Sequence, residues 1–514
     1  MTTSPSFDAR DREQLAERGI PQAEAQRQLE QLAHPPRCLT LERACTPGDG
    51  IERLAAERVA ALLSQHAAVA AAGRVMSFVP ASGAATRMFK DLLACRPRPG
   101  MLTPAELAAC GDAESAALVT FALRLPDFAF HDALAEVLSA RGLSLEVLRR
   151  SGPWRPLLDA LLDPDGLDYA RRPKGLLLFH REPDGVRTPF EEHLDEAREL
   201  TGDAAGVRHL HFTVSPEHRA GFEELLAARR PHLESRHGGW WEVSFSTQHP
   251  STDTLAARPE GGPFRDADSR LVFRPSGHGA LLRNLAESGA DLAFLKNIDN
   301  VCVERLREPT RRWNRALVAL AAELAARAHA LLARLDDPAD AQAPAAAVAY
   351  LAESLGVEAP ARATRAELAA LLDRPLRVCG MVANTGEPGG GPFWVRGDDG
   401  RVTRQIVEMA QVDRRSPAQQ EILARATHFN PVYLACALRD RHGRLHDLER
   451  FVDPQAAIVT RKSYGESELL ALERPGLWNG AMAGWHTVFV EVPLAVFTPV
   501  KTVLDLLRPE HEPG

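Results

Sequence analysis

The chain has 514 residues, of which 45% are hydrophobic and 25% charged, so it is long enough for two domains or for one large α/β domain with helical additions. Its formal net charge of −8 and its aromatic content of only 6% argue against a protein that binds nucleic acid. The start of the chain lacks a signal-peptide pattern and no long uncharged apolar run occurs, so we expect neither export nor a membrane span. The seven scattered cysteines form no Cys-x-x-Cys pair and are interpreted as reduced thiols of a cytoplasmic protein.

The first part of the chain, residues 1–70, is predicted to be helical because apolar residues recur at helical spacing from about residue 6 to residue 65. A β-prone run at residues 75–79 then leads into the sequence PASGAATRM and an amphipathic helix. Small residues at such a strand-to-helix turn expose backbone N–H groups that suit a phosphate, and the guanidinium of Arg87 can bind two phosphate oxygens. A tight turn with a surface arginine is the alternative.

The region 71–302 is interpreted as an α/β core that carries a helical insertion at about residues 92–172. Strands are predicted at residues 175–180, 209–214, 241–246, 271–273 and 292–296. Helical patterns lie between several of these strands, which predicts a mostly parallel sheet.

The remainder of the chain divides into a helical segment and a further set of strands. Residues 303–374 are predicted to be helical, with an interruption at DDPADAQAPAAA. Residues 375–514 are expected to complete the sheet with strands at 376–383, 403–408 and 487–493, followed by the helix-like VKTVLDLLRP.

A single carboxylate, Asp299, follows the apolar run at residues 292–296. Ligands of open α/β sheets bind beyond the carboxyl ends of strands, so this position favours a metal ligand over an ordinary turn residue. Mg²⁺ needs few protein carboxylates, because phosphates and waters complete its coordination. His209 and His211 also alternate on a predicted strand, but they lack a third zinc ligand and are interpreted as a packed pair.

The segment PASGAATRM resembles the glycine-rich signature of sugar nucleotidyltransferases, with Gly83, Thr86 and Arg87 in matching places. The resemblance implies a catalytic role for Arg87. It also implies that the nucleotide is bound by the loop residues Ser82, Gly83, Ala84 and Thr86. The later sequence RPKGLLLFH is similar to the Pro-Lys pair of that family, which makes Lys174 a second catalytic candidate. A solvated surface lysine is the alternative for Lys174.

The sequences PSGHGALLRNLAESG and KNIDN resemble elements of the uridylyltransferase branch of this superfamily, which includes UTP-glucose-1-phosphate uridylyltransferases and UDP-sugar pyrophosphorylases. The resemblance implies that Gly277, His278 and Gly279 line the base and ribose. It also implies that Asp299 holds Mg²⁺ at the phosphates. FSTQHP resembles a base-contacting segment and adds Gln248 as a nucleotide-binding candidate.

Three resemblances to the same branch lie near the end of the chain. QIVEMAQVD and THFNP are similar to sugar-contacting elements and imply that Glu408 and Asn430 bind the sugar. VEVPLAVFTPVKTVLDLL resembles the ending of the uridylyltransferase catalytic domain and implies that Lys501 reaches the transferring phosphates.

Together these resemblances imply a three-layer α/β/α GT-A-like nucleotide-binding fold with a mixed, mostly parallel sheet, plus N-terminal helices and inserted helical segments. The implied enzyme is an Mg²⁺-dependent nucleotidyltransferase of an uncharacterised bacterial family, which joins a sugar 1-phosphate to a nucleoside triphosphate, with UTP favoured. A non-catalytic sugar-nucleotide sensor and a glycosyltransferase are the alternatives. The identity of the sugar and the oligomeric state are left open.

Overall fold

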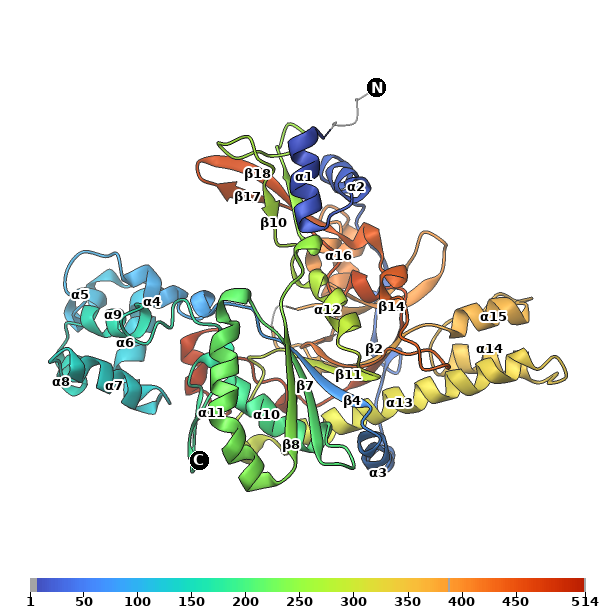
Figure 1. Ribbon diagram of the computed structural model, residues 1–514, viewed down its shortest axis with the longest axis horizontal. Coiled ribbons are helices and arrows are strands. Elements are labelled where there is room, and N and C mark those ends of the chain that lie inside the picture. Colours follow the sequence, from blue (N-terminus) through green and yellow to red (C-terminus); the bar gives the residue numbers. More distant parts are fainter. Residues whose placement is uncertain (1–6, 387–388, 513–514) are drawn as a thin grey trace.

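The computed structural model describes residues 7–386 and 389–512, and its centre is one large mixed β-sheet (Figure 1). The strands of its main path are, in spatial order, β2 (Thr46–Pro47), β3 (Gly50–Glu52), β19 (His486–Glu491), β12 (Leu376–Ala383), β16 (Tyr433–Ala437), β11 (Leu292–Lys296), β4 (Val75–Pro80), β7 (Val207–Thr213) and β8 (Trp240–Ser246). A short strand, β15 (His428–Phe429), pairs with the end of β12.

Neighbouring strands on this path run parallel except at β16, which is antiparallel to both β11 and β12. Because β16 reverses the direction twice, β12 and β19 point the same way as β11 and β4. The carboxyl ends of β4, β11, β12 and β19 therefore lie along one edge of the sheet, which is where open α/β sheets bind ligands.

Alternate residues of the central strands face two separate hydrophobic layers. On β11, Leu292 and Phe294 belong to the cluster that contains the long helix α13 (Glu308–Asp336), whereas Ala293 and Leu295 belong to the cluster that contains α12 (Leu281–Glu287). This period of two places helices on both faces of the sheet, as an α/β/α arrangement requires. The predicted fold class is confirmed.

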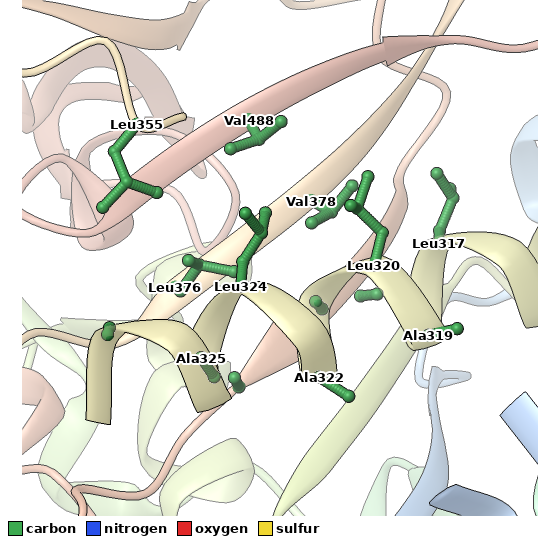
Figure 2. Close-up of a cluster of buried hydrophobic side chains, with 14 of the residues drawn as sticks. Leu317, Ala319, Leu320, Ala322, Leu324, Ala325, Leu355, Leu376, Val378 and Val488 are labelled. Atoms are coloured by element: carbon green, nitrogen blue, oxygen red, sulfur yellow. The ribbon is translucent and has the colours of Figure 1, made fainter. Parts of the chain in front are cut away.

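The helix α13 crosses one face of the sheet with leucines at helical spacing (Figure 2). Leu317, Leu320 and Leu324 are at most 5% exposed and pack with Val378 and Val488 of the strands in one cluster. In the described part of the chain, α13 is the one helix whose length and apolar composition would allow it to cross a membrane, and 61% of its apolar window is buried inside the protein. It serves here as the core helix of the sheet.

The remaining helices and small sheets surround this core. On the sheet itself lie α10 (Pro189–Leu200) and α11 (Arg219–His237), whereas α3 (Ala56–Ala71), α14 (Ala343–Glu353) and α15 (Arg365–Leu372) pack on α13. The insertion consists of α4 (Lys90–Cys95), α5 (Pro104–Cys110), α6 (Ala113–Leu123), α7 (His131–Ala140), α8 (Leu145–Ser151) and α9 (Arg155–Leu162). These helices form a lobe at the left of Figure 1 with an aromatic core of its own.

Two smaller sheets and a hairpin lie outside the main sheet. One sheet joins β10 (Phe273–Arg274), β9 (Thr254–Ala257), β18 (Ser467–Glu473) and β17 (Ile458–Tyr464), and it packs against α1 (Ala9–Arg18) and α2 (Gln22–Ala33). The other joins β1 (Thr40–Ala44), β13 (Gly391–Arg396) and β14 (Val402–Val407), beside α16 (Pro417–Ala424). The hairpin is formed by β5 (His180–Glu182) and β6 (Gly185–Arg187).

Most of the predicted strands are confirmed, but two predictions are wrong. Residues predicted to be helical between Thr40 and Glu52 form β1, β2 and β3, because they pair with strands β13 and β19 that come hundreds of residues later. The apolar run predicted as a strand at 175–180 begins with a 3-10 turn at Lys174–Leu176. A Cβ on Gly175 would lie 2.8 Å from the ring of Phe222, so this run serves as a closely packed connection rather than a sheet strand.

Candidate active site

The loop after β4 is held open at the carboxyl edge of the sheet. Ser82, Gly83 and Ala84 are exposed, and a short 3-10 turn from Ala85 to Arg87 follows them. The guanidinium-bearing residue Arg87 is also exposed. Backbone and side chain at this loop are therefore accessible to solvent.

The same loop is fixed from below by residues that precede Lys174. The backbone N–H of Ala85 donates to the carbonyl of Arg172 over 3.0 Å, and Ala84 forms a β-bridge with Pro173. The hydroxyl of Thr86 donates to the carbonyl of Ala170 over 3.0 Å. Thr86 thus binds the loop to the end of the insertion, and the long insertion returns the Pro-Lys pair to the loop.

Lys174 connects three segments that are distant in sequence. Its ammonium Nζ lies 2.6 Å from Oδ2 of Asp299 and donates over 2.6 Å to the carbonyl of Val500. The two charged side chains are 15% and 19% exposed, so the pair is partly shielded from water. A charge-assisted hydrogen bond in such surroundings is stronger than a surface ion pair.

Asp299 is positioned by backbone contacts with the C-terminal segment. It follows β11 at the carboxyl edge of the sheet, and its carbonyl accepts a hydrogen bond of 3.2 Å from the N–H of Val500. Next to it, the buried amide of Asn300 donates to the carbonyl of Val496 and accepts from the N–H of Thr498. Asn300 was not predicted as a site residue, although the sequence KNIDN contains it.

Lys501 follows this anchored segment directly. The N–H of Lys501 donates to Oδ2 of Asp505 over 2.8 Å, and its ammonium lies 5.6 Å from the ring centre of Phe497. Two residues further on, the N–H of Val503 donates to the carbonyl of Met88, the neighbour of Arg87. The C-terminal segment therefore meets both the Asp299 turn and the Arg87 loop.

A second polar group surrounds His278, which precedes α12. Its imidazole stacks on Trp478 with ring centres 4.0 Å apart, and its Nδ1 accepts a hydrogen bond from the N–H of Leu477. Burial lowers the pKa of His278 to about 4, so the ring is neutral near pH 7 and carries its proton on Nε2. Gly279 is required here, because a Cβ would lie 2.2 Å from the carbonyl oxygen of Pro475. Gly277 has a positive φ of 76°, which glycine adopts without strain.

Glu408 lies beside His278 at the end of β14. Its Oε1 accepts from Nδ2 of Asn479 over 2.6 Å and lies 3.9 Å from Nε2 of His278. Asn479 is buried, and its Oδ1 has no hydrogen-bond partner among the described residues. Sequence reasoning missed Trp478 and Asn479, because the segment PGLWNG matched none of the patterns considered.

The side chains of Asn430 and Gln248 form hydrogen bonds within the protein, so their positions are more structural than those of His278 and Glu408. Asn430 is 4% exposed, and its amide donates to the carbonyl of Gly380 and accepts from the N–H of Val432. Gln248 is half-buried in the loop after β8, and its Nε2 donates to Oδ1 of Asp253 over 3.3 Å. The side chain of Asn430 therefore holds the chain after β15 in place, whereas Gln248 lies on the loop that follows β8.

An aromatic contact joins the C-terminal segment to the residue before Asn430. Phe497, which lies under the ammonium of Lys501, contacts Phe429 edge-on with ring centres 5.1 Å apart. Phe429 immediately precedes Asn430, whose backbone pairs with Gly390. The segments that contain Lys501 and Asn430 are thus packed against each other.

Among residues 7–386 and 389–512, no group of three or more His, Cys, Asp or Glu side chains is arranged to hold a metal ion. Asp299 has one oxygen, Oδ2, bonded to Lys174. A single carboxylate fits Mg²⁺ when phosphates and waters supply its other ligands. His209 and His211 are apart from this region, and His211 bonds the hydroxyls of Ser244 and Ser246.

A family described as "Domain of unknown function (DUF4301)" matches residues 8–512 of the chain. The chain belongs to this family. No curated protein matches it. Among solved structures, the chain is similar to the UDP-glucose pyrophosphorylase from Leishmania major, with 14% identity, a TM-score of 0.46 and coverage of 98% of this chain and 79% of that chain. It is also similar to the uridine diphosphate N-acetylglucosamine pyrophosphorylase from Trypanosoma brucei in complex with an inhibitor, with 12% identity, a TM-score of 0.45 and coverage of 91% and 72%.

Proposed function

We propose that this member of the family is a sugar-1-phosphate nucleotidyltransferase that uses UTP. The observation that carries the proposal is the position of Lys174, whose ammonium joins Asp299 and the carbonyl of Val500, while the residue before it, Pro173, bridges to Ala84 of the exposed loop after β4. Permanent cations, one carboxylate and free backbone N–H groups at the carboxyl edge of an α/β sheet suit a nucleoside triphosphate.

The loop after β4 would bind the phosphates of UTP. Its exposed residues Ser82, Gly83 and Ala84 can present backbone N–H groups, and Arg87 adds a planar fork for two phosphate oxygens. Thr86 would act indirectly, because its hydroxyl already bonds the carbonyl of Ala170 and keeps the loop in place.

Lys174 and Lys501 would neutralise charge on the transferring phosphoryl group. Lys174 is held at Asp299 by hydrogen bonds, so little ordering is needed when a phosphate oxygen replaces one of its partners. Lys501 begins the segment that contacts both Asp299 and the Arg87 loop. Preorganised cations of this kind stabilise a phosphoryl-transfer transition state without covalent chemistry by the protein.

Asp299 is the residue that would hold Mg²⁺, through the oxygen that does not contact Lys174. When bound there, Mg²⁺ would withdraw charge from the phosphate oxygens. This metal dependence is part of the proposal.

The sugar would lie toward Glu408, which can accept hydrogen bonds from sugar hydroxyls. The neutral His278 beside it would contact the base and ribose and can donate a hydrogen bond from Nε2. Asn430 would support this side through the backbone it holds rather than through an exposed amide. Gln248, Gly277 and Gly279 would face the base and ribose.

In the proposed reaction, a phosphate oxygen of the sugar 1-phosphate attacks the α-phosphorus of UTP in line. A new oxygen–phosphorus bond forms, the bond to the β-phosphate oxygen breaks, and pyrophosphate leaves with the electron pair. Arg87, Lys174 and Lys501 would stabilise the charge that develops on these oxygens. We also propose a cytoplasmic location, which the seven free cysteines support.

Release of pyrophosphate from UTP in the presence of Mg²⁺ and a panel of sugar 1-phosphates would test the function. We expect release with at least one sugar, and its loss in Asp299→Asn, which keeps the side chain's shape but removes its charge. Asp268→Asn, at an exposed position in a hairpin of the small sheet, is the matched control and should be fully active.

Two other outcomes would contradict the proposal. Binding of UDP-sugars without pyrophosphate release from any sugar in the panel would indicate a sensor. Transfer of the sugar from a UDP-sugar to an acceptor would indicate a glycosyltransferase.

A further inference from the structure

A cavity of about 570 Å³ lies between the N-terminal helix α2 and the small sheet that contains β9, β17 and β18. Its walls also include the connection from α2 to β1 and the hairpin at residues 258–262. This volume is in the range of cavities that bind small molecules. None of the residues assigned above to UTP, the sugar or Mg²⁺ lines it.

The floor of the cavity is apolar. Leu29 and Leu32 of α2 and Ala457 before β17 are each at most 9% exposed, and they belong to one hydrophobic cluster. An apolar or planar group placed here would be removed from water on contact with these side chains, which favours binding.

The rim of the cavity is basic, although the whole chain carries a net charge of −8. Arg37, Arg258 and Arg461 line the rim and are exposed, and Glu260 is the one acidic residue among the lining residues. Nε of Arg258 lies 3.8 Å from Oε1 of Glu260, and Nη1 of Arg461 lies 2.8 Å from Oε2 of Glu468. Because these two carboxylates balance only two of the three arginines, the rim keeps a local positive charge.

Two polar groups of the cavity lack partners within the described residues. Arg37 forms no ion pair or hydrogen bond with any residue in the ranges 7–386 and 389–512. The hydroxyl Oγ1 of Thr460 is buried and likewise has no hydrogen-bond partner in the described part of the chain. The guanidinium of Arg37 is therefore available to an anion at the rim.

We infer that this cavity binds a small amphipathic anion, with an apolar or planar body on the leucine floor and a phosphate, carboxylate or sulfonate at the arginine rim. Arginine is suited to such anions because its planar fork can bind two oxygens at once. The inference is independent of the proposed function, because it involves other residues and needs no turnover.

The cavity shares one residue with the surroundings of Glu408. Gln411 lines the cavity, its Oε1 accepts a hydrogen bond from the N–H of Glu408 over 2.9 Å, and its Nε2 donates to the carbonyl of Ala456. A ligand in the cavity would therefore lie against the back of the turn that carries Glu408.

The chain contains a reporter for this cavity and a matched control. Cys38 lines the cavity and is exposed, whereas the other exposed cysteine, Cys110, ends α5 in the helical lobe. We would titrate the full chain with anilinonaphthalene sulfonate, and with phenylnaphthylamine, which has the same aromatic body without the anion. Iodoacetamide labelling of each cysteine would be followed by peptide mass spectrometry.

We expect one equivalent of the sulfonate to bind and to slow labelling of Cys38 about fivefold or more, with no change at Cys110. The neutral analogue should bind at least about tenfold more weakly, the scale expected when exposed charge contacts are lost. Arg37→Glu combined with Arg258→Glu should weaken sulfonate binding by a similar factor. Arg270→Glu, an exposed arginine in the same region but outside the cavity, should not.

An unchanged rate of Cys38 labelling at saturating sulfonate would overturn the inference. This measurement uses wild-type protein, so it does not depend on whether the variants fold. Equal affinity for the neutral analogue would overturn the anionic part. Neither result depends on pyrophosphate release, so failure here is distinguishable from failure of the proposed function.

Discussion

The ion pair between Lys174 and Asp299 should have a measurable effect on stability, separate from any effect on turnover. Both hydrogen bonds of the ammonium are 2.6 Å long, and the two side chains are 15% and 19% exposed. Hydrogen bonds to charged groups contribute roughly 1.5–3 kcal/mol, whereas exposed ion pairs contribute roughly 0.2–1 kcal/mol. For a partly shielded pair we expect a coupling free energy of about 2 kcal/mol.

A double-mutant cycle measures this coupling. Lys174→Met, Asp299→Asn and the double variant would be compared with wild type by urea unfolding in the same buffer. Each single variant leaves one partner without its counter-charge, so the double variant should be less destabilised than the sum of the two. Arg283→Met and Glu287→Gln provide a control cycle on an exposed helical pair, where we expect a coupling of about 0.5 kcal/mol or less.

Additive effects within about 0.5 kcal/mol at Lys174 and Asp299 would refute the reasoning. Such a result would mean that the ammonium does not bridge the Asp299 turn and the C-terminal segment in solution. The proposed arrangement of the phosphate site would then lose its main support.

Three further predictions concern the site and the core. Arg87→Ala should mainly weaken binding of UTP, measured by calorimetry, because water cannot replace a bidentate phosphate contact. Unchanged affinity would mean that Arg87 is a surface residue that does not contact UTP. Lys501→Met should lower kcat by about a hundredfold or more with a smaller change in affinity for the sugar phosphate, and a wild-type kcat would remove Lys501 from the mechanism. Burial lowers the pKa of His486 to about 3, so the folded state favours the neutral imidazole. The contribution of this residue to stability is therefore complete above its unfolded pKa of about 6.5 and is lost as the pH falls toward 3. At about pH 5.5 the neutral form of this residue should lower the free energy of unfolding of wild type by about 1.4 kcal/mol relative to neutral pH. The free energy of unfolding of His486→Asn should therefore fall less than that of wild type between the two pH values. An equal fall in the two proteins would contradict the assignment.

Local patterns were sufficient to predict the strands and turns that carry Arg87 and Asp299. The apolar run at 292–296 and the polar residues after it placed Asp299 at a strand end, because burial and turn chemistry act over a few neighbouring positions. The resemblance of the C-terminal segment implied that Lys501 belongs to the same site as Asp299, and a backbone hydrogen bond joins Asp299 to Val500, the residue before Lys501. The roles assigned to these side chains stay predictions.

Features that depend on distant pairing could not be predicted from local patterns. The strands β1 to β3 read as helix, because their partners β13 and β19 lie hundreds of residues away. The same applies to Asn479, whose contact with Glu408 spans 71 residues, and to Trp478, which stacks on His278 across the same fold. A resemblance between short motifs contains no information about such side chains unless the motif includes them.

The position of β19 also has a consequence for how the protein is made. β3 reaches the main sheet by pairing with β19, so strands made early in synthesis must wait for one of the last strands to be translated. Closure of such a long loop is entropically slow, and domains with non-local pairing expose unpaired edges for longer. The nascent chain therefore cannot complete the contacts of Lys174 before the segment that contains Val500 leaves the ribosome, and ribosome-bound chains that stop before β19 should depend strongly on chaperones.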